Sequence, residues 1–527
     1  SYELAEKGAG KVLIDSLQFN LDGLFSERAP VTLRRQSAWN LFVICKENAT
    51  NVSFLRSSGV FRSLARLPGL LLTEQDQFVE LILIALSLIL IESDNGHVSS
   101  GVDLSSSSFQ ALVICSLDEK EDLRSKCRQA LQVEASSSIS RSGSRGTGGG
   151  GPSGLHSKRK MKRKLSSTAS NAISNSTGGG AAEGDLPSDL VKTIIGNWPL
   201  LFSTVLVEQG ARPTQEELGR VLALTCVSSF LMAKAQACAS IRSSAGLPRG
   251  DSRKSGATAD QSLARCQYVL STPGTLKSKE KVGEGEGEGE REGEGEGEEE
   301  GDITALPLIQ LYASQLVRAL RSTNTQESPP SCVDRNATIW QILSVMEAFC
   351  FRNYDTKHLL SGQFRAECPA GMLHMQEELT KLLFQLGPVV KQSVKDATSG
   401  SSCSNNSSNS SCNDSPPRAN ALFMSELNCG AKVEAADTFS MCLKCLVNFS
   451  HDSQGTAMDS VLNAGIDVFL IDLLSFFAEQ RAALADKGVL SPSLPDRPLS
   501  AMQETPIQRV IYGSMLHILA LLTNLVE

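Results

Sequence analysis

The chain has 527 residues, of which 41% are hydrophobic and 5% aromatic, and its formal net charge is −8. This length and apolar content exclude a small disulfide-stabilised scaffold and allow at least two ordinary domains. The acidic balance excludes a basic nucleic-acid clamp, and the few aromatic residues favour helices packed by aliphatic side chains.

The first ordered block is predicted at residues 1–133. An amphipathic helix at Leu33–Cys45 is followed there by a polar turn and a second helix at Val52–Arg66. The apolar run Leu81–Ile91 is bracketed by glutamates and is too short to cross a bilayer of about 30 Å. We therefore expect this run to form a central core helix, and we expect the chain to bind no membrane.

A segment rich in Ser, Gly, Lys and Arg follows at residues 134–184 and is predicted to be a disordered basic loop. Six basic residues inside it form a run that is typical of a nuclear-localisation signal. They are Lys158, Arg159, Lys160, Lys162, Arg163 and Lys164. A non-specific phosphate-binding arm and simple solubilising charge are the alternative interpretations of this run.

Three further blocks of helical repeats are predicted at residues 185–242, 303–397 and 419–527. Two low-complexity segments separate them and are predicted to be disordered: residues 243–302, which end in a Glu-Gly tract, and the Ser/Asn-rich loop 398–418. The Glu-Gly tract is interpreted as an extended spacer, with acidic mimicry of DNA as the alternative.

This organisation predicts an all-α fold, namely a HEAT/armadillo-like helical-repeat solenoid interrupted by long disordered loops. The helix-turn-helix plan of the first block recurs where Asp437–Phe449 is followed by Met458–Ala478. Units of this kind contain about 40–47 residues, and each needs neighbours to bury its apolar face. A stack of such units offers an extended surface to protein partners.

No catalytic constellation is found in the sequence. The phosphate-loop, dinucleotide-binding, zinc-protease and nucleophile-elbow motifs are absent, and the six histidines are dispersed. Cys442 and Cys445 form a C-x-x-C pair inside an amphipathic helix, without the second pair that structural zinc needs, so we interpret them as core thiols in a reducing compartment. We expect a non-enzymatic protein with no cofactor and no metal, and an enzyme of unrecognised type is the alternative.

Several short segments, in one order along nearly the whole chain, carry a family resemblance. They are Phe19–Leu24, Leu33–Ser37, Leu41–Cys45, Phe54–Phe61, Glu92–Gly96, Val345–Ala348, Arg352–Leu360, Cys445–Asp452 and Leu521–Glu527. Together these matched segments resemble the conserved C-terminal domain of the Wings apart-like (WAPL) cohesin-release factors, in particular the plant-type members.

The resemblance implies a nuclear, chromatin-associated protein without reaction chemistry of its own. Its implied partners are the stromalin, kleisin and SMC ATPase-head parts of cohesin and the cohesin HEAT-repeat regulator, with no sequence-specific contact to nucleic acid. It would promote release of cohesin from chromatin by favouring opening of the ring's exit gate, and so act in sister-chromatid cohesion and chromosome segregation. The alternative is a generic armadillo/HEAT nuclear adaptor or transport scaffold, although the single Trp39-Asn40 pair does not form the ladder of armadillo importins.

The resemblance also nominates partner-binding residues, which are polar positions within or beside the matched segments. They are Arg34, Arg35, Arg56, Arg62, Asp94, Asn353, Lys357, Asn448 and Asp452. Each has a structural alternative, because an arginine at a helix start can pair with local acids or carbonyls and an asparagine at a helix end can cap that helix. Asn448 and Asn524 can also form ladder-type bonds to neighbouring loops.

Overall fold

The structure is a computed structural model that describes most of the four predicted helical blocks. The described residues are 2–26, 28–47, 60–94, 104–118, 120–127, 188–203, 212–243, 252–272, 307–321, 333–351, 353, 358–361, 363–364, 373–399, 430–450, 462–486 and 506–526. The Glu-Gly tract and the basic run that resembles a nuclear-localisation signal lie outside these residues.

The described residues are almost entirely helical, which confirms the all-α helical-repeat prediction. The elements are α1 (Tyr2–Phe25), α2 (Val31–Glu47), α4 (Val60–Leu64), the 3-10 helix η2 (Leu67–Leu72), α5 (Gln77–Asp94), α6 (Ser106–Cys115), α8 (Ser188–Asn197), the 3-10 helix η3 (Pro199–Leu201), α10 (Gln215–Ser243), α11 (Ser252–Ser271), α12 (Leu308–Arg321), α13 (Arg335–Cys350), α14 (His358–Ser361), β1 (Gln363–Phe364), β2 (Leu373–His374), α15 (Met375–Ser399), α17 (Gly430–Ser450), α19 (Ile466–Asp486) and α20 (Pro506–Val526). The two short strands pair antiparallel.

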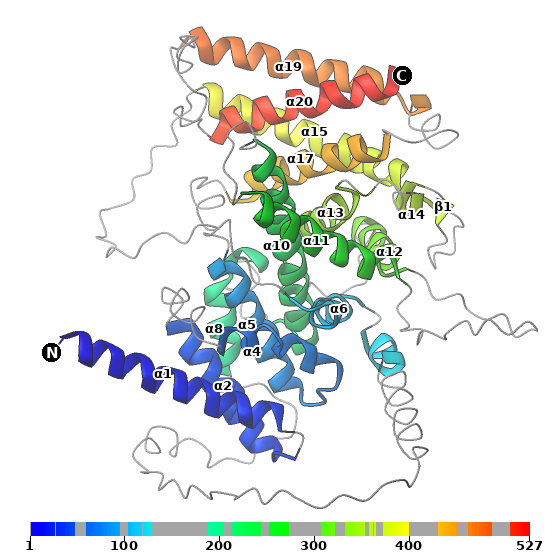
Figure 1. Cartoon of the computed structure of the whole chain (residues 1–527). Helices are drawn as coiled ribbons and strands as arrows, with labels where there is room; N and C mark the ends of the chain where they lie inside the picture. The colour runs from blue at the N-terminus through cyan, green and yellow to red at the C-terminus, as the bar shows by residue number, and fades with distance from the viewer. Residues whose placement is uncertain are drawn as a thin grey trace, which may run out of the picture.

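The helices form a stack that begins with α1 and α2 at one end and finishes with α19 and α20 at the other (Figure 1). The long helix α10 runs through the middle and packs against α5, α6, α11 and α13. Buried apolar side chains from successive layers form one continuous cluster. Each layer therefore buries its apolar face against the next one, as expected for stacked helical units.

The centre of the first block is the apolar run Leu81–Ile91 of α5, in which every side chain is buried. This burial confirms the predicted core helix. Two other helices are long and apolar enough to span a membrane by length and composition: Gln215–Ala239, which is 61% buried over its most apolar stretch, and Ile507–Val526, which is 22% buried. The first is thus a core helix of the stack.

Helix starts follow from local sequence. At α10, the Thr214 hydroxyl accepts the backbone N–H of Glu217 at 3.2 Å, and the Glu217 carboxylate accepts the N–H of Thr214 at 2.8 Å. This reciprocal capping box satisfies two N–H groups that have no partner within the helix. Ser105 and Asp334 cap α6 and α13 in the simpler way, each by accepting the N–H three residues further on.

The prediction that all of residues 243–302 form a disordered loop is wrong for α11. Its C-terminal half buries Leu263, Cys266, Val269 and Leu270 against the neighbouring layers. The segment as a whole is polar and rich in Gly and Glu, so its average composition concealed four apolar residues at helical spacing. Contacts to α6, α10 and α12 place this helix within the stack.

Candidate partner-binding surface

Arg34 and Arg35 lie near the start of α2 and reach the turn between η2 and α5. Arg34 pairs with the carboxylate of Glu74, whose side chain is only 1% exposed. The Nε atom of Arg35 donates to Asp76 Oδ2 at 2.8 Å, and its guanidinium lies 5.9 Å from the centre of the Phe78 ring. The two neighbouring arginines thus join α2 to one turn that lies 40 or more residues further along the chain.

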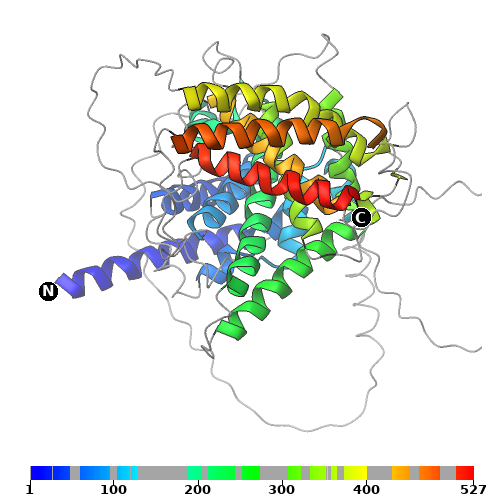
Figure 2. The same cartoon turned by 90° about the horizontal axis from the view of Figure 1, so that it is seen from above.

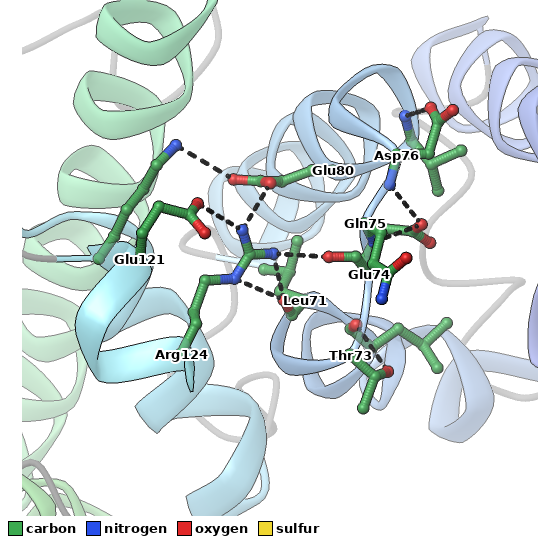
Figure 3. Close-up of polar contacts among 11 residues, drawn as sticks. Leu71, Thr73, Glu74, Gln75, Asp76, Glu80, Glu121 and Arg124 are labelled. Carbon is green, nitrogen blue, oxygen red and sulfur yellow. Dashed lines mark hydrogen bonds and ion pairs between the residues drawn. The ribbon is translucent and has the colours of Figure 1, made fainter. Parts of the chain in front are cut away.

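The carboxylates of that turn also organise its backbone (Figure 3). Glu74 Oε1 accepts the N–H groups of Gln75 and Asp76, each at 2.9 Å. Asp76 Oδ1 accepts the N–H of Val79 at 3.0 Å and so caps α5. Glu74 and Asp76 therefore each pair with an arginine of α2 and also bond to the backbone that leads into the core helix α5.

Arg124, from the helical segment 120–127, approaches the same turn from the other side (Figure 3). Its guanidinium donates to the carbonyl oxygens of Leu71 and Glu74 and to the carboxylates of Glu80 and Glu121. Burial opposes the charge, but the Cys115 thiol and then the carboxylates of Glu80 and Glu121 raise the pKa of Arg124 above its ordinary value. The buried Arg124 guanidinium therefore joins the turn between η2 and α5 to the helical segment 120–127.

A small recess lies beside this cluster, between the starts of α5 and α10. Its volume is about 160 Å³, and its lining residues are Gln77, Glu80, Leu81, Lys120, Glu121, Gln215, Glu216 and Gly219. Small-molecule sites usually have volumes of about 300–1,000 Å³. Lys120 lies 3.6 Å from Glu80, which also binds Arg124. The recess is smaller than a usual substrate or nucleotide site.

The other nominated residues are spread over the stack. Arg62 is exposed on α4, Asp94 is the last residue of α5, and Asn448 lies half-buried near the end of α17. The backbone N–H of Asn353 donates to the carbonyl of Cys350 at 3.2 Å in the turn after α13. Arg56, Lys357 and Asp452 lie outside the described residues, as do Lys158, Arg159, Lys160, Lys162, Arg163 and Lys164. Of the nominated residues, Arg34 and Arg35 are brought together at one turn.

Asn524 of α20 bonds to the last turn of helix α17 rather than to a neighbouring loop, where the sequence left ladder-type bonds open as an alternative. Its Nδ2 atom donates to the carbonyl of Val447 at 3.1 Å and to the hydroxyl of Ser450 at 2.9 Å. Both acceptors lie in the last turn of α17, where the Val447 carbonyl also accepts the Ser450 hydroxyl at 3.0 Å. The last matched segment is therefore in direct contact with Cys445–Asp452, more than 70 residues earlier in the chain.

Cys442 and Cys445 are buried inside α17, which confirms that they are core thiols. The Cys442 Sγ atom donates to the carbonyl of Leu379 at 3.2 Å, and burial raises the pKa values of both thiols well above their ordinary range. A reactive thiol needs the opposite shift. Within the described ranges, no group of three or more His, Cys, Asp or Glu side chains is placed to hold a metal ion.

Three titratable residues lie where α17 packs against α13 and α20. Burial raises the pKa of Glu347, and it raises the pKa of Asp437 to about 6, while Lys444 opposes both shifts and Arg509 opposes the shift at Asp437. Burial and the nearby Lys444 lower the pKa of His517 to about 4. These groups affect the stability of the last layers as the pH changes.

Sequence reasoning missed Glu74, Asp76, Glu80 and Arg124. Asp76 had a usable signal, because an aspartate directly before an apolar periodic run is a typical helix N-cap. Arg124 had none, since its acceptors lie 44 to 53 residues earlier in the chain, apart from Glu121. Comparison of the chain with protein-family models, with curated proteins and with solved structures finds no match. The functional inference therefore rests on the matched segments and the contacts described above.

Proposed function

We propose that the chain is a non-catalytic, nuclear cohesin regulator that binds cohesin and promotes its release from chromatin. The observation that carries the proposal is the bonding of Asn524 to Val447 and Ser450, because it joins two matched segments that are distant in sequence. Segments that resemble one family and also pack on one another act as parts of one folded unit. The stacked helices further supply the extended surface that a multi-subunit partner requires.

The proposed mechanism is differential binding. A domain that binds cohesin more tightly with its exit gate open than with it closed shifts the population toward the open state by that difference in affinity. A difference of about 3 kcal/mol corresponds to a shift of roughly 150-fold. Under this proposal cohesin hydrolyses the ATP, and the chain contributes binding energy alone.

The proposed contact surface includes Arg35 and Arg62, whose side chains are exposed. Arg35 keeps about half of its side chain in solvent even while it bonds to Asp76, so an acidic partner can share its guanidinium. Arg34 is left out of the proposed contact surface, because its ion pair with the buried Glu74 gives it a structural role.

The test is co-purification of the full chain with the stromalin–kleisin pair from the same organism, at low and at moderate salt. We expect stoichiometric binding that weakens at least tenfold when Arg35→Glu and Arg62→Glu are combined. The matched control combines Arg265→Glu and Lys395→Glu, two exposed positions on α11 and α15 that give the same change of charge. Retained binding by the first variant would remove these residues from the contact surface.

A folded chain that does not bind the pair at either salt concentration would overturn the cohesin proposal and favour the adaptor alternative. One contact already weighs against an importin-like adaptor: Trp39 is half-buried and stacks 5.7 Å from Phe42, while the amide of Asn40 donates to Asn20. Both residues of this Trp-Asn pair therefore make contacts within the fold.

A further inference from the structure

The end of α13 receives hydrogen bonds from two sources. The last carbonyl groups of a helix have no partner within it, and in α13 they belong to residues 347–350. The carbonyl of Glu347 accepts the N–H of Phe351 at 3.0 Å. The carbonyl of Cys350 accepts the N–H of Asn353 at 3.2 Å. These two bonds come from the backbone that follows α13, and they leave the two carbonyls in between for other donors.

Gln267 of α11 is the second source. α11 packs against α10 at the side of the stack (Figure 2). The Nε2 atom of this glutamine donates to the carbonyl oxygens of Ala348 at 2.9 Å, Phe349 at 3.1 Å and Phe351 at 2.8 Å. An amide group has two N–H bonds, so the three acceptors share them, as is common at helix ends. Because Gln267 is buried, solvent does not compete for these bonds.

The local sequence does not explain why α13 ends where it does. Glycine and proline are the usual stop signals, and neither occurs in residues 351–361. In a continuing α-helix the N–H of Asn353 would bond to the carbonyl of Phe349. Gln267 bonds to that carbonyl in place of the backbone, and Asn353 bonds to the next carbonyl instead. The backbone of Phe351 is already extended, with φ −60° and ψ 111°. A contact from α11 therefore ends α13.

The chain that follows α13 is held again at its far end by a second glutamine. The Nε2 atom of Gln310, on α12, donates to the carbonyl of Leu359 in α14 at 3.1 Å. α11 and α12 are joined to each other, since the N–H of Leu308 donates to the carbonyl of Thr272 at 3.2 Å. Two connected helices thus form bonds at both ends of the matched segment Arg352–Leu360.

We propose that Gln267 is a positioning residue for the partner-binding surface, because it ends α13 and so presents Asn353 in a turn rather than in a helix. This inference rests on the proposed function, in which Asn353 is a nominated partner-binding residue. A continuing helix would turn each residue by about 100° and raise it by about 1.5 Å, so a partner would meet a different side chain there. α11 thereby shapes a surface more than 80 residues further along the chain.

The first measurement locates the end of α13 by NMR in the full chain. The dipeptide Arg-Asn occurs at Arg335–Asn336, at the start of α13, and at Arg352–Asn353. Arginine labelled with ¹³C at the carbonyl and asparagine labelled with ¹⁵N therefore give one cross-peak for each position. The first cross-peak is an internal reference for helical backbone, and the second reports on the residue after the end of α13.

Gln267→Met removes the donor and keeps a side chain of similar length. We expect the carbonyl signal of Arg352 to move toward the helical value of the reference, because α13 can then continue. Gln261→Met, at an exposed position of α11, is the matched control and should leave the signal unchanged. An unchanged signal in Gln267→Met would show that α13 ends for local reasons, and it would overturn the inference.

The second measurement is the affinity of the same variants for the stromalin–kleisin pair. Gln267→Met should weaken binding at least fivefold, and Gln261→Met should not. A shifted carbonyl signal with unchanged affinity would remove the turn from the partner surface and overturn the inference. If the natural chain does not bind the pair, the cohesin proposal fails together with the partner role of Gln267. The carbonyl signal still decides whether Gln267 ends α13.

Two further variants separate hydrogen bonding from packing. Gln267→Lys keeps three N–H donors on a side chain of similar length, so it should retain the natural carbonyl signal and the natural affinity. An effect of Gln267→Lys equal to that of Gln267→Met would assign the role to packing and overturn the inference. Urea denaturation checks that each variant folds. Gln267→Asn, whose amide is one methylene too short, takes the place of Gln267→Met if the latter does not fold.

Discussion

The backbone carbonyl of Glu74 accepts a hydrogen bond from Arg124 at 3.2 Å, while the carboxylate of the same Glu74 pairs with Arg34. The turn before the core helix α5 is therefore held from two sides by cations from different parts of the chain. This arrangement gives different roles to charges that look alike in the sequence.

Replacement of Arg124 should strongly destabilise the first block. Arg124→Met leaves Glu80, whose side chain is 8% exposed, without its closest partner, and loss of one member of a buried pair costs about 3–5 kcal/mol. Urea denaturation followed by circular dichroism measures the change. Lys126→Met is the control, because Lys126 and Asp122 are both exposed and their pair contributes only about 0.3–0.5 kcal/mol. Similar losses in the two variants would contradict the structural role of Arg124.

Arg34 and Arg35 should respond differently to truncation. Arg34→Ala leaves the buried Glu74 carboxylate with only its backbone donors, so we expect a loss of about 1–3 kcal/mol in the free energy of unfolding. Arg35→Ala removes a bond from a half-exposed side chain and should cost less than about 1 kcal/mol. The same denaturation measurement tests both. A larger loss for Arg35 than for Arg34 would reverse the assignment of fold and surface roles.

Asp437 should make the last layers less stable as the pH rises. Its pKa is raised from 3.8 to about 6 in the folded chain, so its contribution is fully present below about pH 3.8 and is lost as the pH rises through about 6. Asp437→Asn should therefore be more stable than the natural chain at pH 7, by about 1–3 kcal/mol, and the advantage should shrink toward pH 4. Denaturation at a series of pH values measures this difference, and a constant difference at all pH values would argue against the shift.

His517 should make the last layers less stable as the pH falls, which is the opposite of the effect of Asp437. Its pKa is lowered from 6.5 to about 4, so its contribution to stability is present above about pH 6.5 and is lost as the pH falls through about 4. His517→Leu should abolish this loss, and the stability of the variant should vary less between pH 6.5 and 4. The two-dimensional NMR titration of the histidine ring in the natural chain measures the pKa directly, and a value near 6.5 would contradict the assignment.

Gly387 of α15 should not tolerate a side chain, although alanine is normally the better helix former by about 1 kcal/mol. A Cβ atom at this position would lie 2.5 Å from Cζ of Phe469, whose ring packs at a tilt against Phe384 with 4.6 Å between the ring centres. Overpacking of this kind costs about 1–3 kcal/mol, so Gly387→Ala should have a net destabilising effect. In a Phe469→Leu background the same substitution should become neutral or stabilising. Thermal denaturation of the four variants measures this sign change, and additive effects would exclude the contact.

Local patterns in the sequence predicted several features well. The apolar run in α5 already indicated a core helix. Cys442 and Cys445 lie on the apolar side of an amphipathic helix, which the helical period of 3.6 residues reveals, and this indicated that they are core thiols. For Asn524 the sequence left ladder-type bonds to loops open as an alternative, and the structure has such bonds at the last turn of α17 instead. The helix α11 was missed, because a short apolar pattern was averaged with a long polar segment.

The all-α stack follows from the sequence alone, since helix formation and amphipathic faces depend on residues within a few positions of one another. The roles of individual charges do not. Arg34 and Arg35 are adjacent and identical in type, and both reach carboxylates some 40 residues away. They differ because packing leaves 23% of the Arg34 side chain exposed but 54% of the Arg35 side chain. Likewise, α10 and α20 have similar composition, and only packing buries the first and leaves a face of the second in solvent. Such contacts depend on how distant helices stack, which no local pattern specifies.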